Sequence, residues 1–208
     1  DPNDDGNPGG PGEDDPTPVT FTFAPEIGVA KQVSGGPTET TPGSGIFDIS
    51  YLLTVENLGN ETLNDVQLVE DFIDPLTNNS TFGDGNIIIS TVGTITLTGG
   101  ANLTANVNYN VTAVGAVDTN VLDGGGTLPV DASATVLINI QVDTNQPDFP
   151  TDTGAGYNNQ VTASGTGANS GGGVTDDSDN GVAPAPNGDG DPGGPGDERR
   201  GLVSGWGR

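Results

Sequence analysis

Oxygen-bearing side chains at the start of the chain are spaced as in a loop that binds a cation. They occupy every second position and surround a glycine: Asp1, Asn3, Asp5, Asn7 and Gly6. Calcium takes several hard oxygen ligands in flexible geometry, and EF-hand-type loops combine alternate oxygen donors with a glycine at a sharp turn. The pattern predicts a calcium loop, although Gly12 stands where such loops have a glutamate and the prolines allow no flanking helices.

The same segment recurs near the other end of the chain. Residues 1–14 read DPNDDGNPGGPGED and residues 185–198 read APNGDGDPGGPGDE, so nine of the first twelve positions are identical. The second copy and the stretch before it add further candidate ligands: Asp177, Asp179, Asn187, Asp189 and Asp191. This duplication predicts a unit that repeats about every 184 residues, with each copy as a joint between units. The alternative is an acidic Gly/Pro-rich linker that stays solvated and binds nothing.

Composition restricts the classes of function. The 208 residues carry a formal net charge of −25, which repels nucleic acids and anionic membranes and attracts divalent cations. Cysteine and histidine are absent, which excludes disulfides, zinc sites and Ser-His-Asp catalysis. No apolar run approaches the roughly 18 residues of a membrane-spanning helix, so we expect no membrane insertion. An acidic chain that also lacks methionine favours a secreted, extracellular or cell-surface protein, seen here as a processed form or a fragment.

Apolar and polar residues alternate in about eight short segments, and helix patterns are nearly missing. The clearest alternation lies at 46–56, where Phe47, Ile49, Tyr51, Leu53 and Val55 project to one side. Further strands are predicted at 19–23, 27–33, 63–71, 87–97, 103–111, 134–142 and 160–164. The pattern predicts an all-β fold, an Ig-like antiparallel β-sandwich at 18–174, with acidic joints at 1–17 and 175–198.

Three stretches resemble a family. FDISYLLTVENLGNETLNDVQLVEDF at 47–72, LPVDASATVLINIQV at 128–142 and YNNQVTASGTG at 157–167 are similar to strands of the conserved repeat domain of unknown function, number eleven, of bacterial surface proteins. The resemblance covers roughly residues 24–192. It implies an Ig-like domain in tandem arrays with acidic linkers, as part of an extracellular stalk, adhesin or filament. It implies no catalytic residues.

The last ten residues differ from the rest of the chain, since they hold three of its four basic residues and its single tryptophan. We expect a strand donated to a neighbouring unit, in which apolar side chains fill the neighbour's sites and two arginines meet its acidic residues. The residues concerned are Leu202, Val203, Trp206, Arg199 and Arg200. A frayed end is the alternative. Residues 19–23 are a second candidate for exchange between units.

Together these patterns predict a non-enzymatic structural unit of an extracellular bacterial tandem-repeat stalk or filament. Its partners would be copies of itself or adjacent repeats, and calcium would stiffen the joints between them. The alternative is an adhesin module that binds glycans or surfaces through its loops. The sequence offers few aromatic residues for such a pocket, with six Phe, three Tyr and one Trp.

Overall fold

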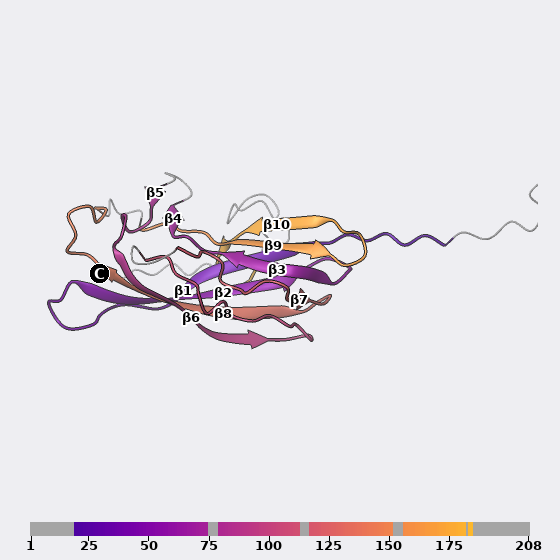
Figure 1. The fold of residues 1–208 in the computed structure, drawn as a ribbon, viewed down its shortest axis with the longest axis horizontal. Helices are drawn as coiled ribbons and strands as arrows, with labels where there is room; N and C mark the ends of the chain where they lie inside the picture. The colour runs from indigo at the N-terminus through magenta and orange to yellow at the C-terminus, as the bar shows by residue number, and fades with distance from the viewer. Residues whose placement is uncertain (1–18, 75–78, 113–116, 152–155, 182, 185–208) are drawn as a thin grey trace, which may run out of the picture.

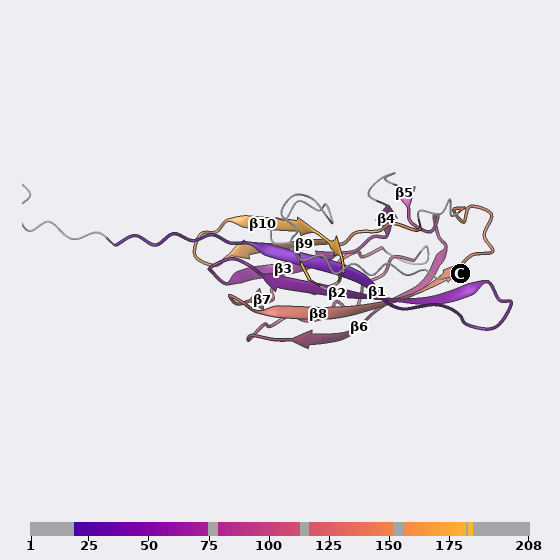
Figure 2. The ribbon, with the colours of Figure 1, turned by 180° about the vertical axis from the view of Figure 1, so that it is seen from behind.

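The computed structural model describes residues 19–74, 79–112, 117–151, 156–181 and 183–184. In this part of the chain the residues form strands, turns and loops, and no helix is long and apolar enough to cross a membrane. Two sheets pack face to face into an elongated sandwich, as Figures 1 and 2 show from opposite sides. The predicted all-β sandwich is confirmed.

The larger sheet has five strands in the order β11-β1-β2-β8-β6. Their bounds are β11 (Asp179–Asn180), β1 (Ile27–Glu39), β2 (Ile46–Asn57), β8 (Ser133–Asp143) and β6 (Ile87–Leu97). The central pair, β2 and β8, is antiparallel and runs without a register shift from the Ile46 and Asp143 pair to the Glu56 and Ser133 pair. Only the short β11 runs parallel to its neighbour, β1.

The smaller sheet has four strands in the order β10-β9-β3-β7. Their bounds are β10 (Gly173–Asp177), β9 (Thr162–Gly167), β3 (Leu63–Val69) and β7 (Thr127–Leu128). A separate small hairpin consists of β4 (Ile73–Asp74) and β5 (Asn79–Ser80).

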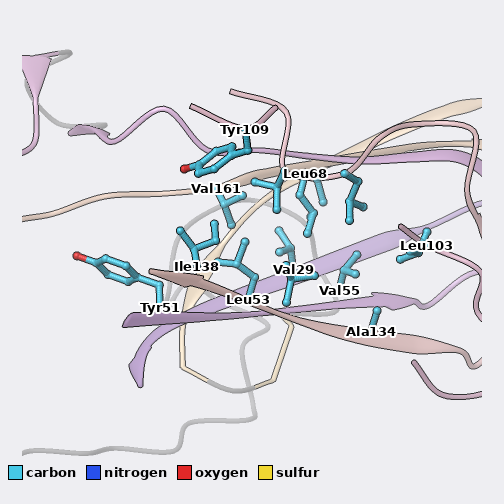
Figure 3. Close-up of a cluster of buried hydrophobic side chains, with 14 of the residues drawn as sticks. Val29, Tyr51, Leu53, Val55, Leu68, Leu103, Tyr109, Ala134, Ile138 and Val161 are labelled. Carbon is cyan, nitrogen blue, oxygen red and sulfur yellow. The ribbon is translucent and has the colours of Figure 1, made fainter. Parts of the chain in front are cut away.

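The core lies between the sheets and follows from the alternation in the sequence. In β2, Leu53 and Val55 are completely buried while Thr54 between them is partly exposed, and β8 repeats this alternation along its whole length. Leu53 and Val55 pack with Leu68 and Val161 of the opposite layer (Figure 3). Removing this apolar surface from water is the main force that holds the two sheets together.

The sequence predictions match some strands closely. Residues 46–56 and 87–97 correspond to β2 and β6, and the pairing of β6 with β8 shifts register between Val92 and Ile95, around Gly93. The sandwich also reaches beyond the predicted boundary at residue 174, because β10 ends at Asp177 and β11 covers Asp179 and Asn180. Part of the segment predicted as the second joint therefore lies inside the sheets.

The strand predicted at 103–111 is wrong. This stretch makes only isolated bridges, at Ala105 and Asn110, and Asn102 just before it makes another. Two asparagine side chains accept hydrogen bonds from the backbone two residues further on: Asn106 Oδ1 from Asn108 N at 2.9 Å and Asn110 Oδ1 from Thr112 N at 3.0 Å. Such local turns compete with a sheet ladder, so alternation alone does not produce a strand here.

Candidate functional site

Most of the residues predicted to bind calcium or a neighbour lie outside the described residues. They are Asp1, Asn3, Asp5, Asn7, Asn187, Asp189 and Asp191 of the joints, and Arg199, Arg200, Leu202, Val203 and Trp206 of the tail. Their roles therefore remain predictions.

Two of the predicted calcium ligands, Asp177 and Asp179, lie in the sandwich. Asp177 is exposed and its Oδ1 accepts a hydrogen bond from Thr162 Oγ1 at 2.6 Å, whereas Asp179 is buried where β11 pairs with Ala30 of β1. The adjacent Asp176 is buried and its Oδ2 accepts a hydrogen bond from Val29 N at 2.6 Å. The three acids thus have different surroundings, and the described residues contain no group of three or more acidic side chains that could hold a metal ion.

Residues 19–23 form a projecting segment that leaves one end of the sandwich, while the β1–β2 hairpin extends from the other end (Figures 1 and 2). The segment belongs to no strand of the sheets, and its apolar side chains alternate with threonines. Val19 is 75% exposed, Phe21 77% and Phe23 41%. The rings of Phe21 and Phe23 stack with their centroids 6.4 Å apart.

Asn60 holds the base of the projecting segment. Its side-chain Nδ2 donates to Thr22 O at 3.0 Å, its Oδ1 accepts from Ala24 N at 2.7 Å, and its backbone N donates to Ala24 O at 3.1 Å. These three bonds fix where the chain leaves the body. Beyond them the alternating apolar side chains face solvent.

The sheets have open edges that could accept such a segment. One edge of the larger sheet is β6, an eleven-residue strand that pairs with β8 on one side. Its side chains include the exposed Ile88, Ile89 and Leu97. A long edge strand with exposed aliphatic residues presents backbone donors and acceptors that another strand can pair with.

A second arrangement lies in the interior and was missed by the sequence predictions. Lys31 of β1 forms a buried ion pair with Glu70, which follows β3 directly. The Lys31 Nζ also lies 4.6 Å from the ring centroid of Tyr51 and 4.7 Å from that of Phe72. Burial lowers the pKa of Lys31, while the charge of Glu70 opposes this shift.

Glu70 is the centre of this buried polar cluster. Its Oε2 contacts Lys31 Nζ, and its Oε1 accepts hydrogen bonds from Asn159 Nδ2 and from Phe72 N, both at 3.0 Å. Tyr109 Oη donates to Glu70 O at 3.3 Å, and burial raises the pKa of this hydroxyl. Figure 3 shows Tyr51 and Tyr109 at the same end of the drawn core. The aromatic rings separate the cluster from solvent.

A sequence signal for this cluster existed. Lys31 falls on the same face of its strand as the apolar Ile27 and Val29, and it is the single lysine of the chain. Burying a lysine on an inner face is costly unless an acidic or polar group in the interior pairs with it, so this position predicts a buried partner. Its partners could not be identified, because residues 70 and 159 are distant in sequence.

Comparison with known proteins adds no relative. The chain matches no protein-family model, and no curated protein matches its sequence. The likeness to the repeat domain therefore stays an expectation from the residues quoted above.

Proposed function

We propose that the chain is a non-enzymatic structural unit that assembles with copies of itself outside a bacterial cell by exchanging strands. The observation that carries this proposal is the projecting segment, an extended run of alternating residues whose Val19 and Phe21 are about three-quarters exposed. Burying one such side chain contributes about 1.5–3 kcal/mol. A neighbour that covers the segment would therefore offset part of the entropy lost on association.

The edge of β6 in a second copy is the acceptor that we propose. An extended peptide added to an open edge gains main-chain hydrogen bonds, and its alternate side chains pack against apolar residues of the acceptor. Both requirements are supported here, by the eleven-residue length of β6 and by its exposed Ile88 and Ile89. Donation from one end of an elongated body favours a linear arrangement of units, as in a stalk or filament.

Calcium in the joints would regulate this assembly. The first joint (residues 1–17) directly precedes the projecting segment, so its conformation sets where the segment can reach. Without a cation, repulsion among its carboxylates would favour no single geometry. Binding calcium would neutralise the charges and fix the turns, which makes strand donation less costly in entropy.

The strand-exchange function is favoured over an adhesin that grips glycans with its loops. A sugar site needs exposed aromatic faces, but Tyr51, Phe72, Phe82 and Tyr109 are all buried in the core. Three aromatic residues in the described part of the chain are exposed, Phe21, Phe23 and Tyr157, and the first two lie in the projecting segment. The surface chemistry therefore suits pairing between units better than sugar binding.

The test is assembly of the full chain, followed by light scattering and negative-stain electron microscopy. We expect filaments or rods at high protein concentration in calcium, and their loss in EDTA. The double variant Phe21→Ser/Phe23→Ser should remain monomeric in calcium. Val107→Ser is the matched control, because Val107 is 93% exposed but lies outside both the segment and the sheet edges. Filaments formed equally by the double variant would overturn strand exchange through this segment. Wild-type chain that stays monomeric in calcium would overturn the assembly itself.

A further inference from the structure

The single lysine of the chain is buried, although the chain carries 29 acidic residues with which a surface lysine could pair. The Lys31 side chain is 4% exposed and its partner Glu70 is fully buried. Removing an amine from water is costly, so a lysine is almost never fully buried unless another group pairs with it.

Glu70 connects the amine to a carboxamide. One of its carboxylate oxygens contacts Lys31 Nζ and the other accepts a hydrogen bond from Asn159 Nδ2 at 3.0 Å. The two nitrogen atoms are therefore held by the two oxygens of one carboxylate group. The remaining polar atom of this carboxamide, Asn159 Oδ1, is buried and has no hydrogen-bond partner among the described residues. Without a covalent bond, the Asn159 carboxamide therefore keeps one buried oxygen without a hydrogen bond.

We propose that Lys31 and Asn159 are joined by a covalent amide bond between Nζ and Cγ, formed within the folded chain with Glu70 as the proton carrier. The residues supply a nucleophile, an electrophilic carbonyl carbon and a group that can act first as base and then as acid. No cofactor or oxidant is needed. The inference does not rest on the proposed assembly, because a single unit would carry the bond.

The reaction balances with the groups present. Glu70 Oε2 takes a proton from the Lys31 ammonium, and the neutral Nζ attacks Cγ of Asn159. The bond between Cγ and Nδ2 then breaks as Glu70 Oε1, already hydrogen-bonded to Nδ2, delivers protons to the leaving nitrogen. Two of the three Nζ protons end on Nδ2, which departs as ammonium, and one stays on the new amide. Glu70 is a carboxylate before and after.

The surroundings favour this step. The rings of Tyr51 and Phe72 lie 4.6 and 4.7 Å from Nζ and keep water from the amine. Burial lowers the pKa of Lys31, which makes the neutral amine easier to form. The hydrogen bond from Phe72 N to Oε1 fixes the carboxylate between its two partners. Because the fold holds the amine and the carboxamide in place, their reaction is intramolecular and avoids the entropy cost of bringing two separate groups together.

The bond would join the two layers of the sandwich. Lys31 lies on β1 of the five-stranded sheet, and Asn159 precedes β9 of the four-stranded sheet. All residues between 31 and 159 would be enclosed in one covalent loop. A pulling force applied to the projecting segment would reach Lys31 in β1 and then be carried by the covalent bond to residue 159. The residues between 31 and 159 would therefore not be extended.

The mass of the intact purified chain tests the proposal first. We expect a mass below that of the sequence by one ammonia molecule. Lys31→Arg and Glu70→Gln should each restore the mass calculated from their sequences. Asn159→Asp should lose water instead of ammonia if it still reacts, and circular dichroism establishes that each variant is folded. A wild-type chain at its full sequence mass would overturn the proposal without reference to any variant.

Digestion after lysine gives an independent reading. Because Lys31 is the single lysine, a lysine-specific endopeptidase can cut the denatured chain at one place, and an amide on Nζ blocks that cut. We expect the denatured wild-type chain to stay whole and Glu70→Gln to yield two fragments. Cyclisation of an asparagine on its own backbone also releases ammonia but leaves Lys31 open to cleavage. Ammonia loss together with cleavage would therefore contradict the cross-link.

Discussion

The Lys31 side chain contacts the Glu70 carboxylate inside the sandwich, where the two side chains are 4% and 0% exposed. The pair connects the first strand of the five-stranded sheet to the end of β3 in the four-stranded sheet. It is thus an ionic contact between two layers that otherwise meet mainly through apolar side chains.

We predict that Glu70→Ala destabilises the fold strongly. The substitution leaves a buried amine without its acid and removes the hydrogen bonds to Asn159 and Phe72. Breaking a buried pair on one side costs about 3–5 kcal/mol, and urea unfolding measures this loss. Glu26→Ala is the matched control, since Glu26 is exposed and its stability effect should stay within about 0.5 kcal/mol. Equal unfolding midpoints for the two variants would contradict the role assigned to the pair.

Acid should remove the stabilisation that Glu61 provides. Burial raises the pKa of Glu61, but hydrogen bonds from Ser170 Oγ, Asn169 N and Ser170 N outweigh it and hold the pKa below its usual value. The stabilisation is therefore full above the unfolded-state pKa of about 4.3 and is lost as the pH falls through the lower folded-state value.

Glu61→Gln isolates this contribution. We expect the difference in free energy of unfolding between wild type and Glu61→Gln to be largest at neutral pH and to shrink in acid. Urea unfolding of both chains at a series of pH values measures it. Other carboxylates with lowered pKa, such as Glu39, Asp118 and Asp143, are common to both chains and cancel in the difference. A difference that is the same at every pH would show that the Glu61 charge does not matter.

The sequence was most informative where local pattern and final packing agree. β2 was predicted correctly because alternation over eleven positions determines which face of a strand is buried, and Leu53 and Val55 lie on that face. The same rule failed at 103–111, where Asn106 and Asn110 form local turns instead. β10 was missed because it follows a run of glycines and ends in two aspartates, a composition that is also typical of a linker.

The buried cluster could not be predicted for a different reason. Lys31, Glu70 and Asn159 lie in three separate stretches, and their meeting depends on how two sheets pack. Periodicity places Lys31 on an inner face but says nothing of what it contacts. The joints were predicted from repetition, and both they and their calcium loops remain predictions, since most of their residues lie outside the described structure.

Asn60→Ala should release the base of the projecting segment. It removes the side-chain hydrogen bonds to Thr22 O and Ala24 N, so the segment becomes more mobile. We expect faster chymotrypsin cleavage after Phe21 or Phe23 in the monomer, measured by mass spectrometry of the fragments. Asn145→Ala is the control, because Asn145 bonds to Ser44 and Asp143 in a different loop. An unchanged cleavage rate in Asn60→Ala would show that these bonds do not hold the segment.

Cross-linking between two chains tests strand exchange most directly. The protein has no cysteine, so Thr20→Cys in one chain and Thr91→Cys in another provide a unique pair for a short bismaleimide and leave the apolar side chains of both segments intact. In calcium the mixture should give a covalent heterodimer, whereas Thr20→Cys mixed with Asn169→Cys, on the turn between β9 and β10, should not. A heterodimer yield with Thr91→Cys no higher than with Asn169→Cys would contradict the donation of residues 19–23 to the β6 edge.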